Sequence, residues 1–322
     1  MARDGIELRP VRAEEIGAIC ALVYRVDRHD GVPRVLSEAE LREDLDQPFV
    51  DLGDDTRVAL RDGELAGWAL VWNPPGAARL ESAYLFGEVD PDHRSQGVGR
   101  ELLAWSFERA TERLRSRPHG LPEYVRVGAF DWLEVNHRLY ARFGFTPVRW
   151  FDELIRPLTS LPAAPVPAGV VVGPWPDDRE EEILATRNAA FADHWGSQPS
   201  DPDSWRSSVN GHGGRPDLSV IAIDRATEAV VGICLNHAYP EDDEVTGRRQ
   251  GWIHNLATVR EWRGRGLASA MIAASLEKFA AAGFTHALLD VDADNPTGAA
   301  RLYRALGFEP LHRSITHEIK VR

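Results

Sequence analysis

The stretch that decides the fold is VDPDHRSQGVGRELLAWSFERA, residues 89–110, because a second version of it recurs as TVREWRGRGLASAMIAASLEKF at residues 258–279. Each version reads as the end of a strand, a short loop with the pattern Arg-x-x-Gly-x-Gly/Ala, and the start of an amphipathic helix. Arg94 and Arg263 mark the same point of the two versions, and they lie in opposite halves of the chain. A repeat of this kind predicts that the chain contains one fold twice.

A second pair of segments supports the duplication. LYARFGF (139–145) is matched by LYRALGF (302–308), in the same order and at nearly the same spacing. Between the copies, four prolines fall within residues 157–167, where they exclude a continuous helix and a central strand. We therefore expect an N-terminal domain at 1–157, a semi-rigid linker at 158–168 and a C-terminal domain at 169–322.

The remaining pattern predicts the same layout in each half. Strand hairpins, such as 56–61 and 65–72 joined at Asp62-Gly63, precede the glycine loop, and a strand–helix–strand unit follows its helix. This mixture indicates an α/β fold in each copy, with a central, mostly antiparallel sheet and helices on both faces. We expect residues 241–249 to form a hairpin loop and the chain to close with a pair of strands from Glu309.

Composition narrows the function. The chain has 322 residues, 43% of them hydrophobic and 27% charged, and its net charge is −13, which argues against nucleic acid or an anionic membrane as a partner. It has no apolar run of about 18 residues and no signal peptide, so we expect a cytoplasmic protein. Only Cys20 and Cys234 are present, which excludes a disulfide framework and a cysteine metal cluster.

The glycine loops are suited to bind an anion. Glycine lets the backbone approach a ligand closely, and a helix N-terminus presents free N–H groups at the positive end of its dipole. Arg94, Arg263 and Arg265 add charge-assisted hydrogen bonds, so a pyrophosphate fits this chemistry. A Walker loop is excluded because no Gly-Lys-Ser/Thr is present, and a dinucleotide fingerprint is excluded because its glycines follow the first strand.

With these residues in view, the chain resembles the GCN5-related N-acetyltransferases (GNAT). The resemblance rests on the Arg-x-x-Gly-x-Gly/Ala loop followed by Leu-Tyr-x-x-x-Gly-Phe, and it covers nearly the whole chain once per half. The segment VDADNPTGAARLYRALGF (291–308) is similar to the C-terminal half of two-domain members of the family. The chain is therefore identified as a tandem GNAT protein.

The resemblance implies acetyl-CoA as co-substrate, with no metal. Its pyrophosphate is expected on the glycine loop and its pantetheine arm beside the preceding strand, around 86–89 and 254–258. The binding residues expected in the first half are Val89, Arg94, Gly97, Val98, Gly99 and Arg100. Those expected in the second half are Leu256, Thr258, Arg263, Gly264, Arg265, Gly266, Leu267, Ala268, Ser269 and Asn295.

The resemblance also places a general acid, which protonates the leaving thiolate, at Tyr140 and Tyr303. The alternative for Tyr303 is a core aromatic, since Leu306 and Phe308 beside it are apolar. In the first half, Trp132 takes the position that Asn295 holds in the second, and Asn136, four residues later, is not expected to replace it. We therefore expect the C-terminal half to be catalytic and the N-terminal half to be a degenerate copy that still binds CoA.

The general base is less constrained by the sequence. His254 lies on the strand before the second glycine loop, and a histidine pKa of about 6.5 suits proton removal from an ammonium. The alternative is a strand histidine with satisfied hydrogen bonds. Other candidates for the base or the acceptor side are Glu81, Glu88, Asp290, Asp292, Asp294, His194, Trp195 and His212.

The leading prediction is an acetyl-CoA-dependent N-acetyltransferase acting on a primary amine of a small molecule, as a monomer or homodimer. One alternative is a non-catalytic acyl-CoA-binding or regulatory tandem module. Another is an aminoacyl-tRNA-dependent transferase, which the acidic charge and the intact Arg-x-x-Gly-x-Gly loop disfavour.

Overall fold

The computed structural model describes residues 5–117, 120–192, 194–294 and 298–322. The chain divides into two compact units. Unit 1 comprises Met1–Arg149 together with Ser314–Arg322, and unit 2 comprises Trp150–Arg313. Each unit is an α/β structure with a mixed sheet and helices on both faces, which confirms the predicted fold class.

The sheet of unit 1 has the order β1-β2-β3-β4-β5, followed by the C-terminal part of β12. All neighbours pair antiparallel except β4 and β5, which run parallel. The strands are β1 (Ile6–Arg9), β2 (Thr56–Arg61), β3 (Glu64–Trp72), β4 (Glu81–Val89), β5 (Glu123–Phe130) and β12 (Glu309–Lys320).

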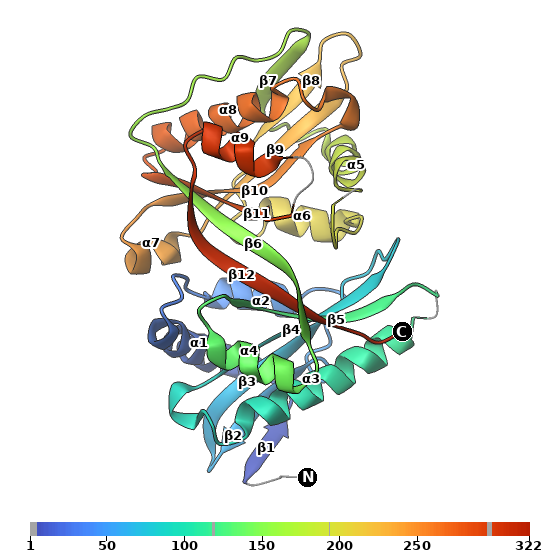
Figure 1. Ribbon diagram of the computed structural model, residues 1–322, viewed down its shortest axis with the longest axis vertical. Helices are drawn as coiled ribbons and strands as arrows, with labels where there is room; N and C mark the ends of the chain where they lie inside the picture. Colours follow the sequence, from blue (N-terminus) through green and yellow to red (C-terminus); the bar gives the residue numbers. More distant parts are fainter. Residues whose placement is uncertain (1–4, 118–119, 193, 295–297) are drawn as a thin grey trace. The chain divides into compact units, whose positions relative to one another are not determined.

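Helices cover both faces of this sheet because its side chains alternate. Along β3, Trp68 and Leu70 pack against α1 and α2, whereas Ala69 and Val71 pack on the side of α3 and α4 (Figure 1). The helices are α1 (Ile16–Asp30), α2 (Glu38–Leu45), α3 (Val98–Arg115) and α4 (Glu134–Arg142), with single 3-10 turns η1 (Ala13–Glu15) and η2 (Pro91–His93).

Unit 2 repeats the arrangement. Its sheet begins with the second part of β6 and continues as β11-β10-β9-β8-β7, with β10 and β11 as the parallel pair. The strands are β6 (Thr146–Pro157), β7 (Val170–Pro174), β8 (Val220–Asp224), β9 (Val230–Ala238), β10 (Gln250–Thr258) and β11 (His286–Asp292). The helices are α5 (Glu180–Phe191), α6 (Pro202–Asn210), α7 (Pro240–Thr246), α8 (Leu267–Ala281) and α9 (Ala299–Ala305), with one 3-10 turn, η3 (Arg260–Trp262).

Two hydrophobic clusters hold the helices of unit 2 to opposite faces of its sheet. Ile183 of α5 and Trp205 of α6 pack with Ile233 and Leu235 of β9 on one face. Met271 and Phe279 of α8 pack on the other face, together with Tyr303 of α9, as Figure 1 shows for the helices. Eight of the 15 residues of α8 are buried, among them Met271, Leu276 and Phe279, which accounts for the high apolar content of this helix.

The structure corrects two local predictions. Residues 241–249 are not a hairpin loop, because Pro240–Thr246 forms helix α7, with proline in its first turn and Gly247 ending it in the left-handed conformation. The chain closes with one long strand from Glu309, β12, rather than a pair.

The compact units do not follow the ends of the sequence repeat. Residues 158–168, the expected linker, contain no helix or strand. However, β6 residues 151–157 pair with β11 in unit 2, and β12 residues 314–320 pair with β5 in unit 1. Each unit therefore takes its last strand from the other half of the chain, and the boundaries 1–157 and 169–322 remain a prediction about domains.

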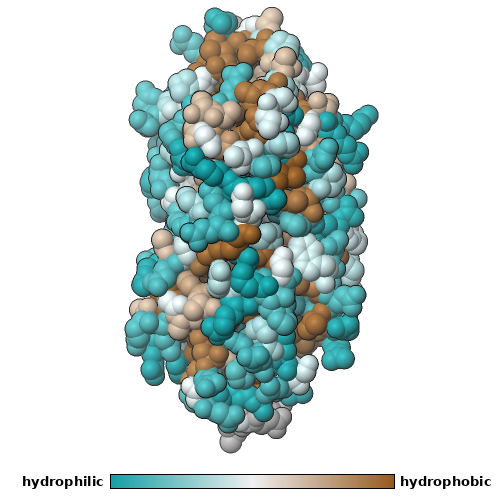
Figure 2. Space-filling view, turned by 90° about the vertical axis from the view of Figure 1, so that its left-hand side faces the viewer, coloured by the Kyte–Doolittle hydropathy of each residue, from teal (hydrophilic) through white to brown (hydrophobic). Residues whose placement is uncertain are grey.

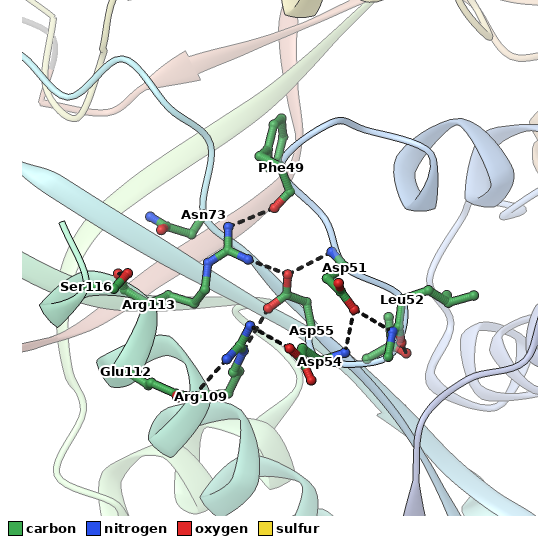
Figure 3. Close-up of polar contacts among 12 residues, drawn as sticks. Phe49, Asp51, Leu52, Asp54, Asp55, Asn73, Arg109, Glu112, Arg113 and Ser116 are labelled. Atoms are coloured by element: carbon green, nitrogen blue, oxygen red, sulfur yellow. Dashed lines mark hydrogen bonds and ion pairs between the residues drawn. The ribbon is translucent and has the colours of Figure 1, made fainter.

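A buried ion pair network fixes the start of β2 to α3 in unit 1 (Figure 3). Asp55 is 1% exposed and accepts hydrogen bonds from Arg109 Nε at 2.8 Å and Arg113 Nη1 at 2.5 Å. The backbone N–H of Asp51 donates to the same carboxylate at 2.9 Å. Such a buried carboxylate is tolerated because its oxygens are satisfied by charged and backbone donors.

The face that Figure 2 shows is mainly hydrophilic with interspersed hydrophobic patches, in agreement with the 27% of charged residues. Within the described residues, no helix combines the length and the apolar character needed to cross a bilayer.

Candidate active site

Both units open a gap in the sheet at the same place. In unit 1, the parallel pairing of β4 and β5 ends at Leu85 and Val127, although both strands continue. In unit 2, the pairing of β10 and β11 ends at Ile253 and Leu289. Beyond these points no pairing between the described residues joins β4 to β5 or β10 to β11, and binding of an extended ligand at 86–89 and 254–258 remains a prediction.

The glycine loops follow these strand ends and adopt the same conformation in both units. Gly97 and Gly266 are the N-caps of α3 and α8, with φ of 93° and 85°. Two residues earlier, Ser95 and Gly264 also have positive φ, at 62° and 72°. These left-handed residues turn the chain so that the helix begins directly behind the strand end.

The first turns of α3 and α8 offer their backbone N–H groups. The first intrahelical hydrogen bonds run from Glu101 to Gly97 and from Ala270 to Gly266. The preceding N–H groups point out of the helix end and can receive a phosphate. These are the N–H groups of Val98, Gly99 and Arg100 in unit 1 and of Leu267, Ala268 and Ser269 in unit 2.

Side chains at the loops contribute less than the sequence suggested. Val98 and Leu267 are each 1% exposed and belong to the cores, so only their backbone faces a ligand. Arg100 lies 3.0 Å from Glu101, and the Arg265 guanidinium stacks 4.9 Å from the ring centre of Trp262.

The first arginine of each loop pattern is turned back toward the protein. Arg94 donates to both carboxylate oxygens of Asp30 at 2.7 Å and to the carbonyl of Val89 at 3.4 Å. Arg263 donates to the carbonyl of Thr258 at 3.2 Å and to that of Ala190 at 2.8 Å. Both arginines therefore brace the loop against the strand end and the last turn of α1 or α5.

Three other predicted binding residues lie at the strand ends. Val89 lines a cavity in unit 1, and Leu256 packs against the core of unit 2. The Thr258 hydroxyl is buried, and it has no hydrogen-bond partner within the described part of the chain. Asn295 lies outside the described residues.

The two candidate acids are buried on the α8–α9 side in unit 2 and on the matching α3–α4 side in unit 1. Tyr303 is 8% exposed, packs with Leu154 and Phe308, and its pKa is raised by burial. Tyr140 is 7% exposed and its pKa is raised to about 12, again by burial. Both phenols therefore remain protonated at neutral pH, as a general acid must.

His254 occupies a distinctive backbone position. The pairing of β10 with β9 shifts between Ile253 and Asn255, so that His254 is the extra residue of a β-bulge. Bulges of this kind re-aim a side chain and are common beside active sites. His254 is an exposed residue, but one face of its imidazole is covered by that of His237, with 4.0 Å between ring centres and 14° between planes.

The surroundings of His254 keep it neutral. Desolvation by the protein around it, then the nearby His237 and Arg187, lower its pKa to about 3. His237, which is 4% exposed and lies 3.0 Å from the Tyr239 hydroxyl, has its pKa lowered to about 4 by burial. A neutral imidazole can accept a proton, although a pKa near 3 makes it a weak acceptor.

Carboxylates lie on the same face of the sheet. Asp290 follows Leu289, which is the last residue of β11 that pairs with β10. Its side chain points away from the α8–α9 side, because Leu289 and Val291 on either side of it pack there. Its cross-strand partner is Glu153 of β6. Burial raises the pKa of Asp290 to about 6, and burial followed by repulsion from Asp290 raises that of Glu153 to about 8.

Sequence reasoning missed Glu153 and His237. Glu153 was hidden because its neighbour Asp290 lies in the other half of the chain, and only the β6–β11 register brings them together. His237 lies two residues after Leu235, so strand alternation predicts that both side chains lie on the same face of the sheet. The stacking of His237 on His254 could not be predicted from the sequence. The candidate Asp292 is partly buried at the end of β11, and Asp294 follows in the turn.

The acceptor-side candidates are dispersed. His194 packs against Phe191 at 4.6 Å between ring centres, and Trp195 lies 6.3 Å from Phe151. His212 lies 3.5 Å from a Glu241 carboxylate oxygen. In unit 1, Glu81 is buried and paired with Arg117 at 2.7 Å, so only Glu88 of the two glutamates lines the cavity.

Each unit has two parallel strands that separate at one end, a left-handed glycine before the next helix, and a buried tyrosine on the helix after the second strand. This combination is typical of the acyl-CoA-dependent acetyltransferase class. Sequence comparison agrees. A profile described as "Acetyltransferase (GNAT) family" matches residues 181–308, and one described as "Acetyltransferase (GNAT) domain" matches residues 53–147. The chain belongs to the GNAT family, carries two copies of its domain, and is an N-acetyltransferase.

Two curated relatives are similar to this chain over nearly their whole length. Mycothiol acetyltransferase of Thermobispora bispora is 30% identical over 287 residues, which span 85% of this chain and 90% of the relative. The protein of the same name from Tsukamurella paurometabola is 29% identical over 314 residues, or 94% of this chain and 95% of the relative.

Solved structures show the same fold. A GCN5-related N-acetyltransferase from Sphaerobacter thermophilus superposes with a TM-score of 0.79 at 27% identity, covering 100% of this chain and 98% of that one. A tandem GNAT protein from the clavulanic acid biosynthesis pathway gives a TM-score of 0.68 at 19% identity, covering 98% of both chains.

Proposed function

We propose that the protein transfers the acetyl group of acetyl-CoA to a primary amine of a small molecule, and that unit 2 carries out this reaction. The proposal rests on three features of unit 2, which we call the frame. These are the end of β10 that does not pair with β11, the first N–H groups of α8, and the buried Tyr303 of α9. The similarity to mycothiol acetyltransferases supports a small amine as acceptor.

Each part of the frame has one task in this proposal. The N–H groups of Leu267, Ala268 and Ser269 bind the pyrophosphate, while Arg263 and Gly266 hold the loop in shape. Backbone groups from Leu256 to Thr258 bind the pantetheine arm as an added strand. Tyr303 donates its proton to the departing thiolate, so that the leaving group departs as a neutral thiol.

The amine enters from the face that bears His254 and Asp290. The Asp290 carboxylate attracts the ammonium group, and His254, which is neutral, accepts the proton that the amine must lose before it attacks. A location in the cytoplasm and a monomeric or homodimeric state remain predictions from the sequence.

The test is turnover by the full-length protein. Acetyl-CoA and a panel of primary amines, including glucosamine and putrescine, are mixed with the enzyme, and free thiol and acetylated product are measured together. We expect both to appear in equal amounts for at least one amine. Binding of acetyl-CoA without release of thiol on any amine would contradict the proposal.

A matched pair of variants connects this reaction to unit 2. His254→Ala should lower kcat and leave acetyl-CoA affinity unchanged, because the imidazole lies on the amine side of the sheet. His286→Ala is the control, since that histidine lies at the opposite, paired end of β11. Equal kcat values for the two variants would remove His254 from the reaction.

A further inference from the structure

Arg187 is a half-buried arginine of α5 that lies on the amine side of the sheet in unit 2. It is four residues after Ile183 and three before Ala190, and both of these pack against β9 and β10. Residues at this spacing share one face of a helix, so Arg187 lies on the face of α5 that covers the sheet. Its charge contributes to the lowered pKa of His254, so the guanidinium is near that imidazole.

Protein groups engage only part of this guanidinium. Its Nη1 donates to the Asn188 side-chain oxygen at 3.0 Å and to the Gln198 carbonyl at 2.8 Å. The group also lies 4.9 Å from the ring centre of Phe191. Nε is sealed from solvent and has no acceptor within the described part of the chain. Nη2 makes no hydrogen bond to a described residue either, but it is not sealed, so this end of the guanidinium can donate to a ligand.

The charge of Arg187 also lacks a counterion. Other arginines of unit 2 have one, since Arg179 lies 2.6 Å from Glu182 and Arg215 lies 2.6 Å from Asp217. Among the residues that the structure describes, no carboxylate forms an ion pair with Arg187, and desolvation lowers its pKa. A partly buried charge without a counterion is costly, and an anionic ligand would offset that cost.

The opposite charge lies elsewhere on the same face. Asp290 on β11 and its cross-strand neighbour Glu153 on β6 carry the carboxyl groups, whereas α5 covers β9 and β10. Strand β10, which bears His254, lies between β11 and β9 in the sheet. The pKa of Asp290 is raised only to about 6, so this carboxylate is ionised at neutral pH. The amine side of unit 2 therefore presents a cation and an anion to one acceptor.

From this arrangement we propose that the acceptor of unit 2 is zwitterionic, with its ammonium group at Asp290 and an anionic oxygen group that accepts hydrogen bonds from Arg187. Its chemical class is that of the amino acids. Charge-assisted hydrogen bonds at both ends would orient such a molecule, and the matching of opposite charges would select it over a simple amine. The inference rests on the proposed acetyl transfer. It leaves the bond changes of that reaction as they are, because the anionic group is only held.

Matched acceptors test the inference with the full-length protein. Glycine, β-alanine and γ-aminobutyrate are each compared with their own amide, which keeps the ammonium group and lacks the anion. O-phosphoethanolamine offers a phosphate in place of the carboxylate. Thiol release with acetyl-CoA gives kcat and KM for each amine, and the ratio of acid to amide is compared between proteins, so that the intrinsic reactivity of each amine cancels.

Three variants accompany the wild type. Arg187→Gln removes the charge and Arg187→Lys keeps it. Arg206→Gln is the matched control, because Arg206 lies on the neighbouring helix α6. Its partners are Glu180 and Asp203, and all three side chains of these ion pairs are well exposed, so its removal should cost little.

We expect the wild type to have a higher kcat/KM for at least one acid than for its amide. Arg187→Gln should raise the KM for that acid about 10- to 100-fold, the scale of a hydrogen bond to a charged group, and change the KM for the amide less than about threefold. Arg206→Gln should change neither. Melting curves report folding, and Arg187→Lys, which should keep part of the preference for the acid, decides the test where the glutamine variant does not fold. A preference for O-phosphoethanolamine that Arg187→Gln abolishes would support the same site with phosphate as its anion.

Binding separates this inference from the proposed function. Titration calorimetry of the acids and amides into protein saturated with CoA measures the anion site without turnover. An acid that binds through Arg187, while no amine releases thiol, would contradict the proposed acetyl transfer and support the anion site. An acid-to-amide ratio that is equal in wild type and Arg187→Gln, in both kcat/KM and binding, would overturn the inference. A rise in KM for acetyl-CoA alone would also overturn it, because Arg187 would then serve the co-substrate.

Discussion

Tyr140 and Tyr303 stand at matching positions of the two units, but their surroundings differ. Tyr140 contacts an amide, a carbonyl and an imidazole, whereas Tyr303 is packed among Leu154, Phe308 and other apolar groups. The glycine loops of the two units share their backbone conformation, with left-handed residues at Ser95 and Gly97 in unit 1 and at Gly264 and Gly266 in unit 2. The two units have therefore kept the conformation of the glycine loop, while the side chains around the matching tyrosines have diverged.

The polar side chains on the face of the sheet to which we assign the amine also differ between the units. Unit 1 presents Glu88, which is engaged by Trp68 and Arg34, and unit 2 presents the stacked pair of His237 and His254. The two units therefore present different chemical groups at this face, a carboxylate in unit 1 and two imidazoles in unit 2. The following variants test where the units are equivalent and where they differ.

The largest expected effect concerns stability. Asp55→Ala removes the buried carboxylate that Arg109 and Arg113 share, and breaking a buried pair in this way costs about 3–5 kcal/mol. In the sequence repeat, Lys278 of unit 2 matches Arg109. Among the described residues, its ammonium group donates a hydrogen bond only to the carbonyl of Asp217. Lys278→Ala should therefore change stability by about 0.5 kcal/mol or less.

Calorimetric melting of the two variants measures this contrast. The part of the melting profile assigned to unit 1 should move to lower temperature in Asp55→Ala, and the profile of Lys278→Ala should overlay that of the wild type. Similar shifts in both variants would show that the two units depend equally on this contact.

The second prediction concerns pH and the amine. Asp290, whose pKa is raised to about 6, is neutral below that pH and carries its charge above it. The KM for a cationic amine should therefore fall as pH rises through about 6, since the carboxylate gains the charge that attracts the ammonium. Asp290→Asn should raise KM about tenfold at pH 7.5, the scale of one charge-assisted hydrogen bond.

Steady-state kinetics between pH 5 and 9, with the titration of the amine itself measured separately, provide the readout for Asp290. The control is Asp292→Asn, at the end of the same strand and partly buried. A KM that stays pH-dependent in Asp290→Asn would exclude this carboxylate as the amine partner.

The third prediction is smaller and concerns the loop of unit 2. Gly266 has φ of 85°, and an L-residue in the left-handed region costs about 1 kcal/mol, so Gly266→Ala should weaken acetyl-CoA binding to unit 2 about fivefold. Gly264→Ser is the control, because unit 1 has Ser95 at that position with the same sign of φ. Titration calorimetry compares the two, and equal affinities would mean that the glycine is not required for its conformation.

The smallest expected effect is that of Gly99→Ala in unit 1. A Cβ at this position would meet Leu139 at 3.4 Å and Val89 at 3.5 Å, which is ordinary contact, and unit 2 already has Ala268 there. Acetyl-CoA affinity, measured by the same titration, should stay within about twofold of the wild type. A larger loss would show that the ligand approaches the α3 backbone more closely than it approaches that of α8.

Much of the fold was readable from the sequence because it depends on local chemistry. A strand was predicted at 56–61 and a helix directly after the glycine loop, and the structure has β2 at Thr56–Arg61 and α3 beginning at Val98, because the Asp62-Gly63 turn and a glycine N-cap mark these ends locally. Helix α7 was not predicted, because the acidic residues after Tyr239 are typical of a loop. In the structure Pro240 begins this helix.

The duplication, the two glycine loops and the tyrosines behind them could be derived from the amino-acid sequence alone, because each is a contiguous pattern whose backbone demands are local. The folded chain was needed to see which strand completes each sheet, that Asp290 lies beside Glu153, and that Asn136 rather than Trp132 reaches Tyr140. Strand register and side-chain contacts join residues far apart in the chain, and the shifted pKa values follow from the burial and charge that these contacts create.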